Sequence, residues 1–146
     1  SNLSSRAKQV TFTVKVNNVA GCTLNSTAMS FGNVTLLNAV KDATSTVTVT
    51  CTKNVKYDVG LSNGTGGGTG PTARRMTNTS TTSYITYGIY RDAARTLPWG
   101  DVIGTNTVNA RGNGRAQAYT AYGRIPVQPT PPGFTYTDTV TATVTY

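Results

Sequence analysis

Two-residue alternation between apolar and polar side chains recurs along this chain, and it constrains the fold more than any other feature. In residues 46–52, for example, valines at positions 47 and 49 alternate with threonines. This period places successive side chains on opposite faces of a β-strand, and it does not suit a helix. The chain also contains 29 Thr, 15 Val and no Glu, and β-branched residues favour strands. The sequence therefore predicts an all-β protein.

Several segments are strand candidates, and turn-forming residues separate them. The candidates are residues 10–16, 46–52, 57–61, 85–90, 119–127 and 139–146. Each fits a half-buried antiparallel strand with its apolar residues inward and threonine outward. Stretches rich in Gly, Pro and Asn supply the breaks at 62–71, 111–114 and 129–133. Six or seven short strands in 146 residues indicate one β-sandwich.

The composition argues against catalysis. The chain has no His, which excludes Ser-His-Asp and Cys-His catalysis and every His-ligated metal site. Its five carboxylates are scattered Asp residues, and no two lie close enough in sequence to suggest an acid–base pair. We therefore expect no enzyme, no metal and no organic cofactor.

The net charge of +8 could attract a polyanion. The basic residues are spread thinly, however, and no run of five Lys or Arg occurs. A solvated basic surface is the simpler interpretation.

The two cysteines, Cys22 and Cys51, predict a disulfide. Such a bridge would stabilise the fold by roughly 3–4 kcal/mol in the chain-entropy model. The alternative is two unpaired buried thiols. A disulfide, together with the lack of any apolar run near 18 residues, favours the periplasm, the cell surface or the medium.

The first alternating strand has two interpretations. Val10, Phe12, Val14 and Val16 share one face, and Asn17-Asn18 separates them from the rest of the chain. This strand could be the first strand of its own sandwich, or it could complete another copy of the protein. In the second interpretation, residues 1–18 form a donor-strand extension and residues 19–146 form the sandwich.

Motifs along nearly the whole chain carry a family resemblance. They include Gly21-Cys22-Thr23, the central Tyr90-Arg91-Asp92-Ala93-Ala94-Arg95 and the closing Asp138-Thr139-Val140. From Gln9 to Tyr146 the chain resembles archaic chaperone–usher pilins of the spore coat protein U domain family. That resemblance implies an immunoglobulin-like sandwich that lacks its last strand, with the gap filled first by a chaperone and later by a neighbour's N-terminal extension.

The resemblance also implies partners, a location and a site. The partners are other copies in a head-to-tail homopolymer, a periplasmic chaperone, an outer-membrane usher and a tip subunit, with neither membrane insertion nor specific nucleic-acid binding. The protein would be secreted through the periplasm into a surface pilus for attachment and biofilm formation, with one domain and a donor strand fitting a repeating shaft subunit. The walls of the acceptor groove are expected to be Val140, Ala142, Val144 and Tyr146 from the last strand, and Leu24 and Phe31 from the first strand of the sandwich.

One alternative remains open. The chain could be a monomeric cell-surface or coat β-sandwich protein, with its N-terminal strand folded onto itself. It would then bind carbohydrate or polyanion, using aromatic residues such as Trp99 and Tyr84 as stacking faces. Such aromatic residues more often belong to the core or edge of a sandwich.

Overall fold

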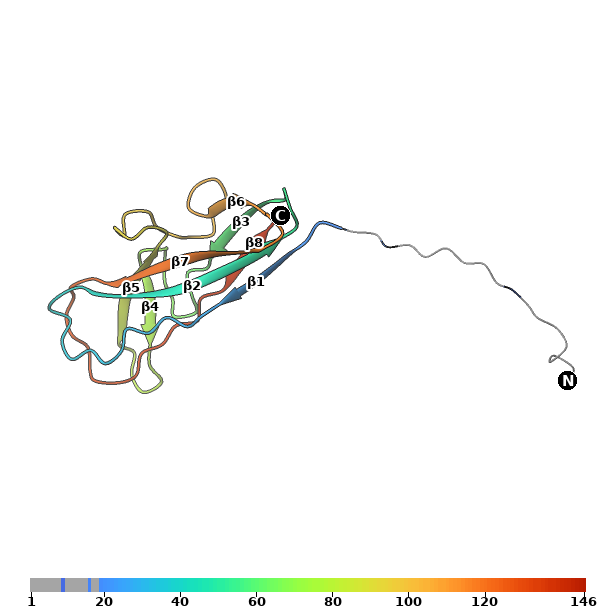
Figure 1. Cartoon of the computed structure of the whole chain (residues 1–146). Coiled ribbons are helices and arrows are strands. Elements are labelled where there is room, and N and C mark those ends of the chain that lie inside the picture. The colour runs from blue at the N-terminus through green and yellow to red at the C-terminus, as the bar shows by residue number, and fades with distance from the viewer. Residues whose placement is uncertain (1–8, 10–15, 17–18) are drawn as a thin grey trace, which may run out of the picture.

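The computed structural model describes residues 9, 16 and 19–146, which form eight strands and no helix (Figure 1). The strands are β1 (Cys22–Ser26), β2 (Lys41–Cys51), β3 (Lys56–Leu61), β4 (Arg74–Thr77), β5 (Tyr84–Tyr90), β6 (Val108–Arg111), β7 (Ala116–Ile125) and β8 (Ala142–Thr145). None of the described residues forms a helix long and apolar enough to cross a membrane.

The strands form two antiparallel sheets. One sheet has the order β1-β2-β7-β5-β4, and the other has the order β6-β3-β8. Apolar side chains from both sheets make a single core, whose buried members on the strands are Val47, Val49, Cys51, Tyr57, Val59, Leu61, Tyr87, Ile89, Ala121 and Ile125. The all-β prediction is therefore confirmed.

The alternating pattern located most of the strands. It predicted β2, β3, β5, β7 and β8, although β2 begins at Lys41, well before the clearest alternation. In β2 the buried residues are Val47, Val49 and Cys51, and the threonines between them are half-buried. The four-residue strands β4 and β6 were not predicted, because each is too short to show a period. The first strand of the sandwich was expected around residues 24–31, but it ends at Ser26.

The predicted disulfide is present between Cys22 and Cys51. These two residues are directly opposite each other in the register of β1 and β2. The bridge therefore fixes the start of β1 to the end of β2.

Arg74, the first residue of β4, lies inside the sandwich although it is charged. Its side chain is fully buried and donates hydrogen bonds to four backbone carbonyl oxygens, at 2.8 Å from Ser62, 2.6 Å from Pro71, 3.2 Å from Leu61 and 2.7 Å from Trp99. The indole of Trp99, also fully buried, donates to the carbonyl of Val59 at 2.8 Å. These bonds give donors to the carbonyls of the loop residues Ser62, Pro71 and Trp99 and to two carbonyls of β3.

Candidate functional site

Two sheet edges approach each other on one side of the sandwich. β1 is the last strand of its sheet and β8 is the last strand of the other, and the two strands lie close together (Figure 1). After β1 the chain continues along this side, and residues 28–36 form no backbone–backbone hydrogen bond within the described part of the chain. On the facing side, residues 134–141 lead into β8. In this segment Thr137 exchanges two backbone hydrogen bonds of 2.8 Å with Thr77, and the carbonyl of Thr141 accepts one of 2.9 Å from the N–H of Ser62. Unpaired backbone of this kind can pair with an added strand.

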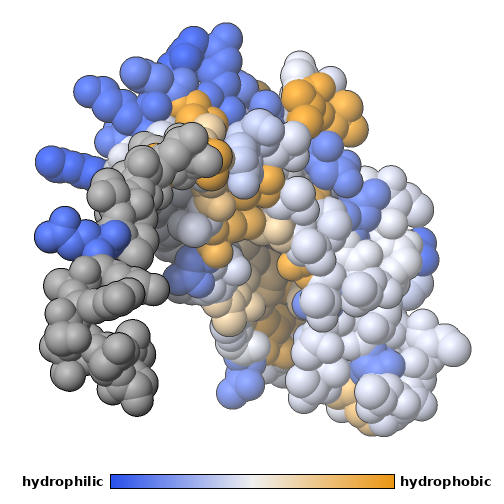
Figure 2. All heavy atoms as spheres, turned by 90° about the vertical axis from the view of Figure 1, so that its right-hand side faces the viewer, coloured by the Kyte–Doolittle hydropathy of each residue, from blue (hydrophilic) through white to orange (hydrophobic). Residues whose placement is uncertain are grey.

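An apolar groove lies between these two segments. Its first part is a cavity of about 410 Å³ with Met29 and Phe31 on one wall and Val140 and Ala142 on the other. The floor consists of core residues from both sheets, namely Val47, Leu61, Tyr87, Ile89 and Ala121. Figure 2 shows the hollow between its two walls, with hydrophobic side chains lining its depth. The groove thus reaches down to the core from this side.

The groove continues into a second cavity of about 460 Å³ toward Ile125 and Leu37. Met29, Phe31 and Met76 line both cavities, together with Tyr136 and Thr137. Phe31 packs edge-to-face on Tyr87, with ring centroids 6.3 Å apart. The two cavities therefore form one elongated groove with a waist at Met29 and Phe31.

A carboxylate anchors one wall of the groove. Asp138 accepts hydrogen bonds from the backbone N–H groups of Thr65 at 2.9 Å and Gly66 at 3.1 Å, and from the Tyr87 hydroxyl at 2.6 Å. Burial raises the pKa of Tyr87, and the hydrogen bond to Asp138 raises it further. A Cβ at Gly64 would lie 2.1 Å from an Asp138 carboxylate oxygen, so the glycine-rich loop needs this glycine. Asp138 is thus committed to structure, and its role gave no signal in the sequence.

The residues predicted to form the acceptor groove are only partly brought together. Phe31, Val140 and Ala142 line the first cavity. Leu24 and Val144 pack against the core outside the cavity, and Tyr146 is 61 % exposed rather than turned inward. The sequence reasoning missed the floor residues and Met29, although the inward positions of β2, β5 and β7 could have indicated several of them.

Most of the predicted donor strand lies outside the described residues. This applies to Val10, Phe12 and Val14 and to the division at residue 18. Val16 is described and is 87 % exposed, so it does not lie in the groove of its own chain.

The aromatic residues mostly serve the core. Trp99 and Tyr87 are buried, whereas Tyr84 is 42 % exposed beneath the guanidinium of Arg75, which lies 4.1 Å from its ring centre. Among the described residues no three His, Cys, Asp or Glu side chains cluster as a metal site would require.

The fold and the open groove define a class of protein: an all-β, immunoglobulin-like sandwich that is incomplete along one side. A solved structure has the same fold, with a TM-score of 0.65 at 21 % identity, over 88 % of this chain and 40 % of that one. It is a complex of the chaperone CsuC with the tip adhesion subunit CsuE, from archaic chaperone–usher Csu pili of Acinetobacter baumannii.

The family is shown by sequence. The family model of the Spore Coat Protein U domain matches residues 8–143, and the chain belongs to this family. Protein U of Myxococcus xanthus is 35 % identical over 107 residues, which are 70 % of this chain and 59 % of that protein. The chain therefore spans about three-fifths of the curated relative.

Proposed function

We propose that this protein is a structural subunit of a secreted chaperone–usher pilus and that it polymerises by donor-strand exchange. The observation that carries the proposal is the apolar groove between residues 28–36 and β8, whose edges have unpaired backbone. The residues that would fill it in the next copy are Val10, Phe12, Val14 and Val16. Because the donor and the groove are different surfaces of one chain, the contact generates a linear head-to-tail polymer.

The proposed contact between donor strand and groove would release enough free energy to hold two subunits together. Four apolar side chains buried at ~1.5–3 kcal/mol each contribute on the order of 6–12 kcal/mol. Each new backbone hydrogen bond adds roughly 0.5–1.5 kcal/mol. The sum is comparable with the stability of a whole domain. Side chains two residues apart lie about 6.8 Å apart along a strand, so the donor face would extend about 20 Å along the elongated groove.

Family membership supports the rest of the proposal. The solved relative in fold was captured with its chaperone before assembly, according to its description. By analogy, a periplasmic chaperone would cover the groove of this chain until an outer-membrane usher places it in the fibre. A tip subunit would end the fibre, which would serve surface attachment and biofilm formation.

The test uses two matched variants of the donor strand. Phe12→Arg places a charge on the face that enters the groove, and Thr13→Arg places the same charge on the opposite face. Losing the Phe12 contact removes about 3 kcal/mol or more, so we expect at least about a 100-fold loss of polymer. Gel electrophoresis without boiling should show a ladder for the natural chain and for Thr13→Arg, but a single band for Phe12→Arg.

Two outcomes would contradict the proposal. A normal ladder from Phe12→Arg would remove the donor strand from the contact. A single monomer band from the natural chain, with no fibres in electron micrographs, would favour the monomeric alternative in which the strand folds back.

A further inference from the structure

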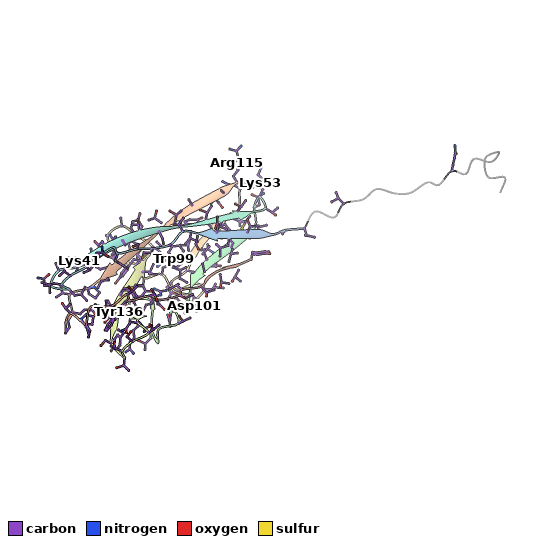
Figure 3. All side chains as sticks on the ribbon, turned by 90° about the horizontal axis from the view of Figure 1, so that it is seen from below. Lys41, Lys53, Trp99, Asp101, Arg115 and Tyr136 are labelled. Carbon is purple, nitrogen blue, oxygen red and sulfur yellow. A yellow bond between two sulfur atoms is a disulfide. The ribbon has the colours of Figure 1, made fainter. Side chains whose placement is uncertain are left out.

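One end of the sandwich carries a cluster of cations, which we call the basic pole: Lys53, Lys56, Arg111 and Arg115. All four are exposed. Lys53 lies in the turn between β2 and β3 and Arg115 in the turn between β6 and β7, whereas Lys56 begins β3 and Arg111 ends β6. Figure 3 shows Lys53 and Arg115 near each other at the end where β1 begins. Figure 2 looks onto this end and shows hydrophilic side chains gathered along its upper rim.

The two turns that carry the pole are fixed to each other. The N–H of Asn54 donates to the carbonyl of Gly112, and the N–H of Gly112 donates to the carbonyl of Val55, both at 2.8 Å. The N–H of Gly114 donates to the carbonyl of Cys51 at 3.0 Å. Because a Cβ at Gly112 would lie 2.3 Å from the carbonyl oxygen of Thr52, the approach depends on glycine. The cations therefore stand on a rigid base, which lowers the entropic cost of binding a ligand.

Carboxylates do not neutralise the pole. Within the described chain, the ion pairs join Asp42 to Arg95 and to Arg124. Asp42 is at the opposite end of the eleven-residue β2, about 30 Å away at the usual rise per residue. Asp58 is the one carboxylate on the strands of the pole, and it accepts a hydrogen bond from the Thr107 hydroxyl at 2.8 Å.

Two cations of the pole directly oppose each other. Lys56 and Arg111 are partners in the register of β3 and β6, so their side chains share one face. Like charges at such a pair are destabilising. Arg111 is held in place by donating to the carbonyl of Asn54 at 3.1 Å. An anion that binds beside both cations would relieve this repulsion.

We propose that the basic pole binds an anionic polysaccharide that carries carboxylate or sulfate groups. Single-stranded nucleic acids are usually held by stacking on aromatic rings, and residues 52–56 and 111–115 contain none. At the far end of another copy, Asp42 is already paired with Arg95 and Arg124, which argues against that end as the source of the anion. The amide side chains of Asn54 and Asn113 add polar groups suited to a hydroxyl-rich chain.

The experiment compares two variants with equal net charge. Lys56→Gln/Arg111→Gln removes two cations from the pole, and Lys41→Gln/Arg75→Gln removes two cations elsewhere. Binding of the full-length chains to heparin and to polygalacturonate is measured at about 0.15 M salt. We expect the pole variant to bind about tenfold more weakly and the control to change less than about twofold. The melting temperature of the pole variant should change little, because the loss of the hydrogen bond from Arg111 to Asn54 is offset by the removal of a repulsion.

Three results would overturn the proposal. Equal weakening in both variants would show that net charge alone drives binding. Failure of the natural chain to bind either polysaccharide would remove the site. Tighter, pole-dependent binding of duplex DNA would assign the pole to nucleic acid. Because the pole lies outside the groove, the polymer ladder of all three chains should be the same, and this separates the pole from the proposed assembly.

Discussion

Across residues 19–146, backbone polar groups have hydrogen-bond partners on one side of the sandwich and lack them on the other. Around Arg74 and Trp99, side chains donate to backbone carbonyls of loops and of β3. Within the described residues, no buried side-chain polar atom lacks a partner. Along the groove, by contrast, residues 28–36 have no backbone partner in the described part of the chain, and a cavity reaches down to the core. The closed side holds the fold together, and the open side is left free to bind.

The largest effect should follow from breaking the closed side at Arg74. Replacing Arg74 with Leu leaves the four carbonyls without donors in a buried site, and we expect a loss of about 3–5 kcal/mol of unfolding free energy. Urea unfolding measures this loss. Both chains carry Phe12→Arg as well, so that polymerisation does not contribute to the measured stability.

The neighbouring Arg75 is the matched control for that experiment. It is half-buried and contacts the ring of Tyr84, so Arg75→Leu should cost less than about 1 kcal/mol. Equal losses in the two variants would mean that the carbonyl contacts of Arg74 do not stabilise the closed side.

Alanine substitutions at two glycines, one on each side, should have effects of intermediate size on the unfolding free energy. An added Cβ at Gly112 meets the Thr52 carbonyl oxygen at 2.3 Å, whereas one at Gly123 meets the Met29 sulfur at 2.4 Å. The first clash is with backbone, so Gly112→Ala should cost about 1–3 kcal/mol in urea unfolding. The second is with the end of a flexible side chain, so Gly123→Ala should cost less than about 1 kcal/mol.

In polymerisation the order should be reversed: Gly123→Ala should weaken the polymer ladder more than Gly112→Ala does. In Gly123→Ala the displaced Met29 side chain moves into the groove, so the ladder should weaken while the fold persists. A full ladder from Gly123→Ala would show that the waist of the groove does not contact the donor strand.

How far sequence could predict the molecule also differs between the two sides. Alternation located the long strands, because a half-buried strand must present one apolar face. It could not find Arg74 in the core, because an arginine is almost never fully buried and nothing local indicates its four carbonyl partners. β4, which begins at Arg74, was missed because four residues are too few to show a period.

The sequence predicted a groove beside the last strand, but it predicted only some of the residues that line the cavity there. The inward positions of the last strand gave Val140 and Ala142 correctly as lining residues. The same period placed Tyr146 inward, but β8 ends at Thr145 and the ring beyond it is exposed. Phe31 was predicted and lines the cavity, whereas Met29 was missed, because it lies outside any strand and no period marks its inward position.

The smallest effect concerns the ion pair at the far end of β2. Hydrogen bonds from Arg124, at 2.8 and 3.0 Å, lower the pKa of Asp42 below its ordinary 3.8, and the charge of Arg95 lowers it further. Because the folded state favours the ionised carboxylate, the pair stabilises the fold above the unfolded pKa. This contribution is lost as the pH falls through the folded pKa.

The melting temperature should therefore decline slightly more for the natural chain than for Asp42→Asn between about pH 5 and about pH 2. The comparison is needed because the pKa of Asp92 is also lowered, by its hydrogen bond from Thr96, and that residue contributes to both chains. Both groups lie away from the groove, so acidification in this range should leave the ladder of the natural chain unchanged. Parallel pH curves for the two chains would show that the ion pair does not stabilise the fold, and that the closed side depends on its buried hydrogen bonds alone.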